Sequence, residues 1–295
     1  MPIDVFLVVL AAAALHAGWN TMLKLRARPG AGAPVDPMLS TLLLGIAASL
    51  VSLAVMPIFG LPDRVAWPCA LASAVIHVAY YLLVGAAYRV ADLSAVYPIT
   101  RGTAPMGSAL LAALLLGETL APAAWAGVAA ICAGVIGMAT VALRRGGLSW
   151  AGLGFAGTNA VVVTLYTLVD GQGARLSGNP AGYTLALEAL CGPMLLPVLA
   201  LTLRGQGHIA TALKSALAGG RWWRAILGAC MSIGAYAAAL WAMTRAPIGA
   251  VAALRETSVL LGVLLGAIVL REHVGLSRWI AAAVIVAGAM LVRLG

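Results

Sequence analysis

Ten long apolar segments make up most of the chain, and short segments rich in charge, proline or glycine separate them. A helix that crosses a bilayer needs about 20 apolar residues. The pattern predicts spanning helices over residues 3–23, 37–59, 66–88, 94–116, 121–143, 149–169, 180–203, 222–243, 247–270 and 275–294. These runs are continuous, whereas the strands of a membrane barrel are short and alternate. We therefore predict an all-α integral membrane protein with ten transmembrane helices.

The first apolar segment begins next to Met1, with no basic stretch before it and no small-residue cleavage site after it. Residues 3–23 are also long enough to cross a bilayer. This segment is therefore predicted to be the first transmembrane helix rather than a cleaved signal.

The composition supports a membrane environment. Hydrophobic residues make up 63% of the chain, charged residues make up 9%, and the mean hydropathy is +1.03. The net charge is +9, but the basic residues stand at the ends of apolar segments. That placement is typical of charge that sets membrane topology, and it argues against nucleic-acid binding. The four cysteines lie in separate apolar segments without metal or redox spacing, so we expect no metal and no cofactor.

The sequence repeats itself after 154 residues. This shift places Arg101 on Arg255, Glu118 on Glu272, Trp125 on Trp279 and Gly134 on Gly288. The predicted repeats are residues 1–145 and 146–295, each with five helices. Because five is odd, the second copy must enter the membrane from the opposite side. Inverted repeats of this kind are typical of secondary transporters, with the binding site between the copies near the middle of the membrane.

Short motifs then suggest a family. Gly117-Glu118 and Arg271-Glu272 close the fourth helix of each repeat, and the first helix carries His16-Ala17-Gly18-Trp19-Asn20. Together with the ten spans, these motifs resemble the drug/metabolite transporter superfamily in its ten-helix, EamA-like branch. The resemblance implies a multi-pass protein of the cytoplasmic (inner) membrane with two EamA-like repeats. It also implies a central cavity lined by helices 1, 3, 4, 6, 8 and 9, and transport without ATP.

The orientation in the membrane stays open. Apart from Arg101 and Arg255, sixteen Lys and Arg remain, and twelve of them fall in the loops that follow helices 1, 3, 5, 7 and 9. The positive-inside rule then places both termini outside the cytoplasm. The family resemblance implies cytoplasmic termini instead.

Arginine in the middle of a span is the strongest candidate for a binding group, because charge inside a membrane usually faces a cavity or a partner. Arg101 lies between Pro98 and Pro105, which predicts that the helix kinks or unwinds beside it. A guanidinium beside freed backbone groups would bind an anion. The alternative is that Arg101 pairs with an acid and locks helices together. Arg255 occupies the matching position, and the adjacent Glu256 could be its counter-charge, a proton carrier or an interfacial residue.

Other polar residues in the spans are further candidates. Glu188 is the one acid in the seventh span, where it could bind a substrate amine, take up a proton or neutralise an arginine. His16, Trp19 and Asn20 share one helix face, and His77 shares a face with Tyr81. The histidines could equally be packing groups. The remaining candidates for substrate binding are Tyr97, Tyr166, Tyr236 and Trp241.

These features predict a secondary transporter rather than an enzyme. The expected solute is a small anionic or zwitterionic metabolite, similar to an amino acid or an aminophosphonate, moved by alternating access. The alternative is a membrane enzyme or flippase that acts on a lipid-linked substrate, although the acidic residues show no catalytic clustering. The expected partners are the solute, the lipid bilayer and, as a candidate coupling ion, a proton. Ten helices can enclose a cavity alone, so we expect a monomer.

Overall fold

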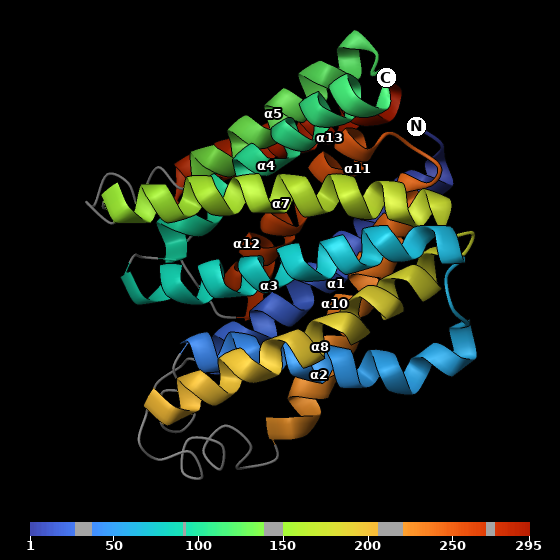
Figure 1. Ribbon diagram of the computed structural model, residues 1–295. Helices are drawn as coiled ribbons and strands as arrows, with labels where there is room; N and C mark the ends of the chain where they lie inside the picture. Colours follow the sequence, from blue (N-terminus) through green and yellow to red (C-terminus); the bar gives the residue numbers. More distant parts are fainter. Residues whose placement is uncertain (27–36, 91–92, 139–149, 206–220, 270–274) are drawn as a thin grey trace.

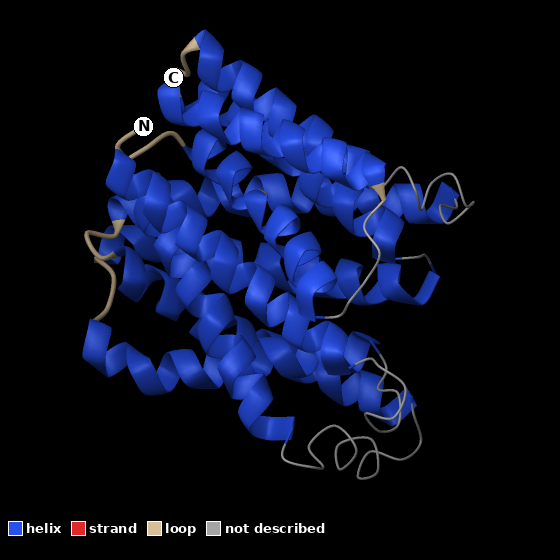
Figure 2. Cartoon of the chain, turned by 180° about the vertical axis from the view of Figure 1, so that it is seen from behind, coloured by secondary structure: helices blue, strands red, loops and turns tan. Residues whose placement is uncertain are grey.

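The computed structural model describes residues 1–26, 37–90, 93–138, 150–205, 221–269 and 275–295. Within these ranges the regular structure is helical throughout (Figures 1 and 2). The helices are α1 (Ile3–Arg26), α2 (Pro37–Phe59), α3 (Trp67–Val90), α4 (Leu93–Leu116), α5 (Pro122–Met138), α7 (Trp150–Leu176), α8 (Pro180–Gly205), α10 (Arg221–Met243), α11 (Ile248–Arg255), α12 (Thr257–Val269) and α13 (Leu276–Leu294). A short 3-10 turn, Arg64–Ala66, precedes α3.

The prediction of ten spans is confirmed, with α11 and α12 together forming the ninth. Eight described helical stretches are long and apolar enough to cross a membrane, and Ile3–Gly18 and Pro122–Met138 are shorter apolar helices. The sixth span is longer than predicted: α7 continues past residue 169 to Leu176, because the polar Asp170 is buried inside the bundle. The predicted boundary between the repeats, 145/146, falls outside the described residues.

The two halves make the same set of helix contacts. Helix α2 packs against α8, and α5 packs against α13. Helix α3 packs against α7, and α10 packs against α1 (Figure 1). The 154-residue shift carries α1 to α7 and α3 to α10. The contact between α3 and α7 in one direction therefore corresponds to the contact between α10 and α1 in the other. The bundle therefore has an internal two-fold relationship between its halves.

Glycines at the α5–α13 contact show this relationship at atomic detail. A Cβ on Gly134 would lie 2.9 Å from the Ala281 carbonyl oxygen and 2.6 Å from Ile285 Cγ1. A Cβ on Gly288 would lie 2.8 Å from the Gly127 carbonyl oxygen and 2.8 Å from Ile131 Cγ1. The 154-residue shift pairs Gly134 with Gly288, Gly127 with Ala281 and Ile131 with Ile285. Small residues let membrane helices approach closely, and here the same close approach is made twice.

The chain ends fix how the halves are inserted. The Met1 amino group donates a hydrogen bond to the Arg293 carbonyl oxygen at 3.2 Å, and both termini lie at one end of the bundle (Figures 1 and 2). We call this the terminus end. Five spans take the first half from the terminus end to the other end, and five spans bring the second half back. The two repeats are therefore inverted with respect to each other.

The ninth span is interrupted beside the arginine of the second repeat. Helix α11 ends at Arg255 and α12 begins at Thr257, with Glu256 at φ −70° and ψ −11° between them. The Glu256 N–H donates to the Ala253 carbonyl at 2.9 Å, which is a three-residue step instead of the four-residue step of an α-helix. The α-helical hydrogen-bond pattern is thus interrupted at the residue that follows Arg255.

Of the two outcomes predicted at the α4 prolines, a kink or unwinding, unwinding is wrong, because α4 is continuous from Leu93 to Leu116. Hydroxyl groups bond to its backbone around Pro105. Ser108 Oγ donates to the Ala104 carbonyl at 3.0 Å, and Thr164 Oγ1 of α7 donates to the same carbonyl at 3.1 Å. The second of these bonds ties α4 to α7 one residue before Pro105, whereas the carbonyl that loses its helical donor at this proline belongs to Arg101.

Candidate functional site

An ion pair joins the two repeats at their matching arginine positions. Arg101 Nε lies 3.0 Å from Glu256 Oε2, and the two side chains are only 7% and 5% exposed. Glu256 stands between α11 and α12, and α11 packs against α4, which carries Arg101. The pairing of Arg101 with an acid, one of the two interpretations of the sequence, is therefore present in the structure, and it occurs at the edge of a cavity.

Arg255 has a different environment from Arg101. Its guanidinium carbon lies 5.0 Å from the centre of the Tyr236 ring, on the face of that ring. Among the described residues, no carboxylate forms an ion pair with Arg255. The site therefore contains one neutralised arginine and one arginine that faces an aromatic ring.

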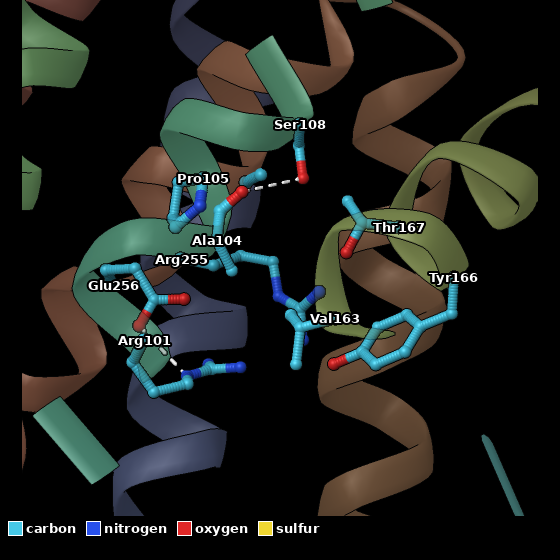
Figure 3. Close-up of a pocket in the computed structure, with 10 residues that line it drawn as sticks. Arg101, Ala104, Pro105, Ser108, Val163, Tyr166, Thr167, Arg255 and Glu256 are labelled. Atoms are coloured by element: carbon cyan, nitrogen blue, oxygen red, sulfur yellow. Dashed lines mark hydrogen bonds and ion pairs between the residues drawn. The ribbon is translucent and has the colours of Figure 1, made fainter. Parts of the chain in front are cut away.

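A small cavity lies beside both arginines. Its lining residues are Arg101, Ala104, Pro105, Ser108, Val163, Tyr166, Thr167, Ala252, Arg255 and Glu256. Figure 3 shows both guanidinium groups extending toward α7, where Val163, Tyr166 and Thr167 form the facing wall. The cavity is narrow, with room for about one water molecule. A larger solute therefore requires the walls of the cavity to separate.

An aromatic cluster continues the site from the cavity toward α3. His77 stacks on Tyr166 with ring centres 4.3 Å apart, and the centres of His77 and Tyr236 are 5.9 Å apart. Tyr80 lies edge-on to Tyr166 at 5.7 Å and to Tyr81 at 5.6 Å. The structure thus brings together the predicted His77, Tyr81, Tyr166 and Tyr236 from three different helices, and it adds Tyr80.

His77 is also held by its own helix. Its Nδ1 lies 3.0 Å from the Ser73 carbonyl oxygen and 3.1 Å from the Ser73 hydroxyl. One ring nitrogen is therefore engaged by the backbone one turn earlier. This contact orients the imidazole against Tyr166 and agrees with the packing role that the sequence left open.

Asp170 is a buried acid whose importance the sequence did not reveal. Its side chain is fully buried in α7, and its two carboxyl oxygens accept hydrogen bonds from the hydroxyls of Tyr183, at 2.9 Å, and Tyr236. Gly173 leaves room for the Tyr183 ring against α7. Tyr236 therefore contacts a cation with its ring and an acid with its hydroxyl.

Glu188 of α8 lies apart from the cavity lining and is 7% exposed. Within the described parts of the chain, its Oε2 atom has no hydrogen-bond partner and no arginine forms an ion pair with it. The interpretation in which Glu188 neutralises an arginine therefore has no support in the described residues. Tyr81 lies within electrostatic range of its carboxyl.

The remaining predicted residues do not line the cavity. His16 is half-buried on α1, outside the lining set. Trp241 lies near the terminus end, where the Arg245 guanidinium carbon is 4.6 Å from its ring centre. The side chains of Trp19, Asn20 and Tyr97 lie outside the described part of the structure.

A polar network closes the bundle at the terminus end. Glu118 pairs with Arg175 of α7, and its Oε2 accepts a hydrogen bond from the Ile248 N–H at 2.8 Å. Arg175 donates from Nε to the Met243 carbonyl at 2.8 Å and from Nη2 to the Ala246 carbonyl at 3.2 Å. The end of α4, the end of α7 and the start of α11 are thus tied together. The repeat counterpart Glu272 lies outside the described residues.

The profile of the EamA-like transporter family matches the chain twice, over residues 5–140 and 150–294. A solved structure described as "Crystal structure of protein" has a TM-score of 0.74 and 23% sequence identity. The match covers all of this chain and 98% of the other, so the two share a fold. No curated protein matches the chain. The double match to the family confirms the resemblance drawn from the sequence.

Proposed function

The chain belongs to the EamA-like transporter family, and on that premise we propose that it moves a small anionic or zwitterionic metabolite by alternating access. It is a multi-pass integral membrane transporter, and the proposed location is the cytoplasmic membrane. One chain encloses the whole cavity, so the proposed functional unit is a monomer. The observation that carries the proposal is the position of Arg255 in the cavity wall without a carboxylate partner among the described residues.

Charge balance supports an anionic group on the solute. Arg101 and Glu256 neutralise each other, which leaves the charge of Arg255 as an excess positive charge at the cavity. Charge inside a membrane protein is costly unless a partner balances it. A carboxylate or phosphonate can accept two parallel hydrogen bonds from one guanidinium, so such a group would both balance Arg255 and be oriented by it.

Aromatic and acidic groups next to the arginines would suit a solute that also carries an amine. Tyr166 lines the cavity, and Tyr236 lies against Arg255. The faces of such rings attract ammonium groups. Glu256 adds a carboxylate at the cavity wall. An amino acid or an aminophosphonate presents both charges within a small volume, which matches this combination better than a simple cation does.

The inverted halves and the broken ninth span support alternating access. In inverted-repeat transporters, discontinuous helices supply the binding groups, and one repeat rocks against the other around the site. Here the discontinuity lies between α11 and α12, next to Arg255. The cavity has room for about one water molecule, as expected for an occluded state between two open ones.

A flux assay in proteoliposomes tests this function. The purified protein is reconstituted, and uptake of labelled amino acids and aminoethylphosphonate is measured against empty liposomes. Arg255→Gln should abolish the flux, because the uncharged amide cannot balance an anion. Arg64→Gln changes an exposed arginine in the turn before α3 and should leave the flux unchanged. Equal flux in wild type and Arg255→Gln, or chemical alteration of the solute, would refute the proposed function.

A further inference from the structure

Glu188 is a carboxyl group held inside the bundle away from the arginines. It lies about 12 Å along α8 from the start of that helix at Pro180. Helix α8 packs against α2, α3, α7 and α10, and the Glu188 side chain is 7% exposed. The sequence leaves three roles open for this residue, and the absence of an arginine partner among the described residues leaves amine binding and proton uptake.

The surroundings of Glu188 disfavour a negative charge. Its Oε2 atom is buried without a hydrogen-bond partner among the described residues. An ionised carboxylate that is neither paired nor fully hydrogen-bonded is strongly unfavourable inside a protein, whereas the neutral acid is tolerated.

The neighbouring elements present acids and hydroxyls to Glu188. Helix α3 presents the phenol of Tyr81, and α7 presents Asp170, which is in electrostatic range of Glu188. Asp170 is held by the hydroxyls of Tyr183 and, from α10, Tyr236. On α8 itself, Cys191 lies nearby. Two buried acids within electrostatic range of each other are unfavourable when both are ionised. The hydroxyls of Tyr183 and Tyr236 donate to Asp170 and stabilise its carboxylate, so the proton belongs on Glu188.

Helix α2 presents hydroxyl groups at the same level of the bundle. Ser49 Oγ donates to the Ala189 carbonyl at 2.9 Å, and a Cβ on Gly192 would collide with Ser49. Helices α2 and α8 run in opposite directions. Ser52, which follows Ser49 by about one helical turn, therefore lies nearer than Ser49 to the level of Glu188. The Ser52 hydroxyl is also buried without a hydrogen-bond partner in the described residues. Helices α2 and α8 thus each carry a buried polar group, Ser52 and Glu188, whose hydrogen bonds are incomplete among the described residues.

The contact between α2 and α8 is also a contact between the two repeats. If the halves rock against each other, as the proposed function requires, the contacts of α8 change and water gains access to the buried Glu188. We propose that Glu188 is a proton-binding site that couples solute movement to proton movement. The inference therefore rests on the proposed function. Water on one side supplies a proton to the carboxylate, the neutral acid persists in the occluded state, and the proton leaves to water on the other side.

Infrared spectroscopy of the reconstituted protein tests the protonation state without any solute. The difference between wild type and Glu188→Gln at neutral pH should contain the carbonyl stretch of a protonated carboxylic acid. Asp4→Asn removes an exposed acid from the first turn of α1 and should leave that band in place. Loss of a carboxylate band instead, with no acid band in the difference spectrum, would overturn the proposal.

Flux measurements then test the coupling. Wild-type proteoliposomes should exchange labelled amino acids or aminoethylphosphonate without a gradient, and a pH gradient should drive accumulation of the same probes. Glu188→Gln should keep the exchange, which also demonstrates folding, while its gradient-driven accumulation falls to the level of empty liposomes. Glu188→Asp retains a carboxyl group and should retain part of the accumulation.

The results separate the two proposals. Exchange in wild type that a pH gradient does not augment would overturn proton coupling and leave the transport function standing. Gradient-driven accumulation by Glu188→Gln at the wild-type level would do the same. Absence of any flux in wild type would refute the transport function, whereas the infrared spectrum would still report whether Glu188 holds a proton.

Discussion

The guanidinium carbon of Arg255 lies 5.0 Å above the ring of Tyr236, and the hydroxyl of that tyrosine donates a hydrogen bond to Asp170. One side chain therefore links the cation that faces the cavity to an acid buried in α7. Because a cation–π contact needs only the ring and the hydrogen bond needs only the hydroxyl, substitutions can separate the two contributions.

Tyr236→Phe keeps the ring beneath Arg255 and removes one of the hydroxyl donors to Asp170. Leaving a buried acceptor without its partner should lower the free energy of unfolding by about 1–3 kcal/mol. Tyr236→Leu also removes the ring and should in addition raise the KM of transport. Denaturation in mixed micelles measures the first effect, and uptake kinetics measure the second. A KM raised equally in both variants would contradict a separate role for the ring.

Glu256→Gln removes the partner of a buried arginine. Arg101 then loses this carboxylate, and we expect the free energy of unfolding to fall by about 3–5 kcal/mol. Replacing both residues by methionine removes the charge together with its partner and should recover most of that loss. A double-mutant cycle in mixed micelles measures the coupling. Simple additivity of the single losses would show that the pair contributes nothing.

The helices could be predicted from the sequence because a spanning segment is defined by its own composition. The inverted repeat was also visible, since polar landmarks such as Arg101 and Arg255 recur in one register. The role of Glu256 could not be decided in this way. Its counterpart in the first repeat is Gly102, so the repeat gives no second example of the acid. Only the distance from Glu256 to Arg101 distinguishes among the roles left open.

Asp170 and the continuity of α4 show what local reasoning misses. An acid near the end of an apolar run resembles the end of a span, but Asp170 is stabilised by hydroxyls 13 and 66 residues away along the chain. Pro105 removes a backbone donor, yet α4 remains helical through this residue. The first outcome depends on neighbouring helices, and the composition of a single span specifies neither.

Gly134→Ala and Gly288→Ala should destabilise the protein by similar amounts. In each case the new Cβ meets a backbone carbonyl oxygen, at 2.9 Å and 2.8 Å respectively, so α5 and α13 must separate. Overpacking of this kind costs about 1–3 kcal/mol. The matched control is Gly154→Ala in α7, where a Cβ has no neighbour within 4 Å, and alanine should stabilise that helix slightly. Thermal unfolding compares the three variants, and a large difference between the first two would contradict the two-fold relationship.

Glu118→Gln should loosen the terminus end of the bundle. The substitution removes the ion pair with Arg175 and weakens the acceptor for the Ile248 N–H at the start of α11, where a negative charge is favourable. The cavity should then open more often toward this end. A cysteine introduced at Ser108 in the cavity wall, with the native cysteines replaced, reports opening through its rate of reaction with a charged thiol reagent added on that side. That rate should rise in Glu118→Gln but not in Asp63→Asn, which alters an exposed acid at the same end. An unchanged rate would mean that the network fastens the helix ends without gating access to the cavity.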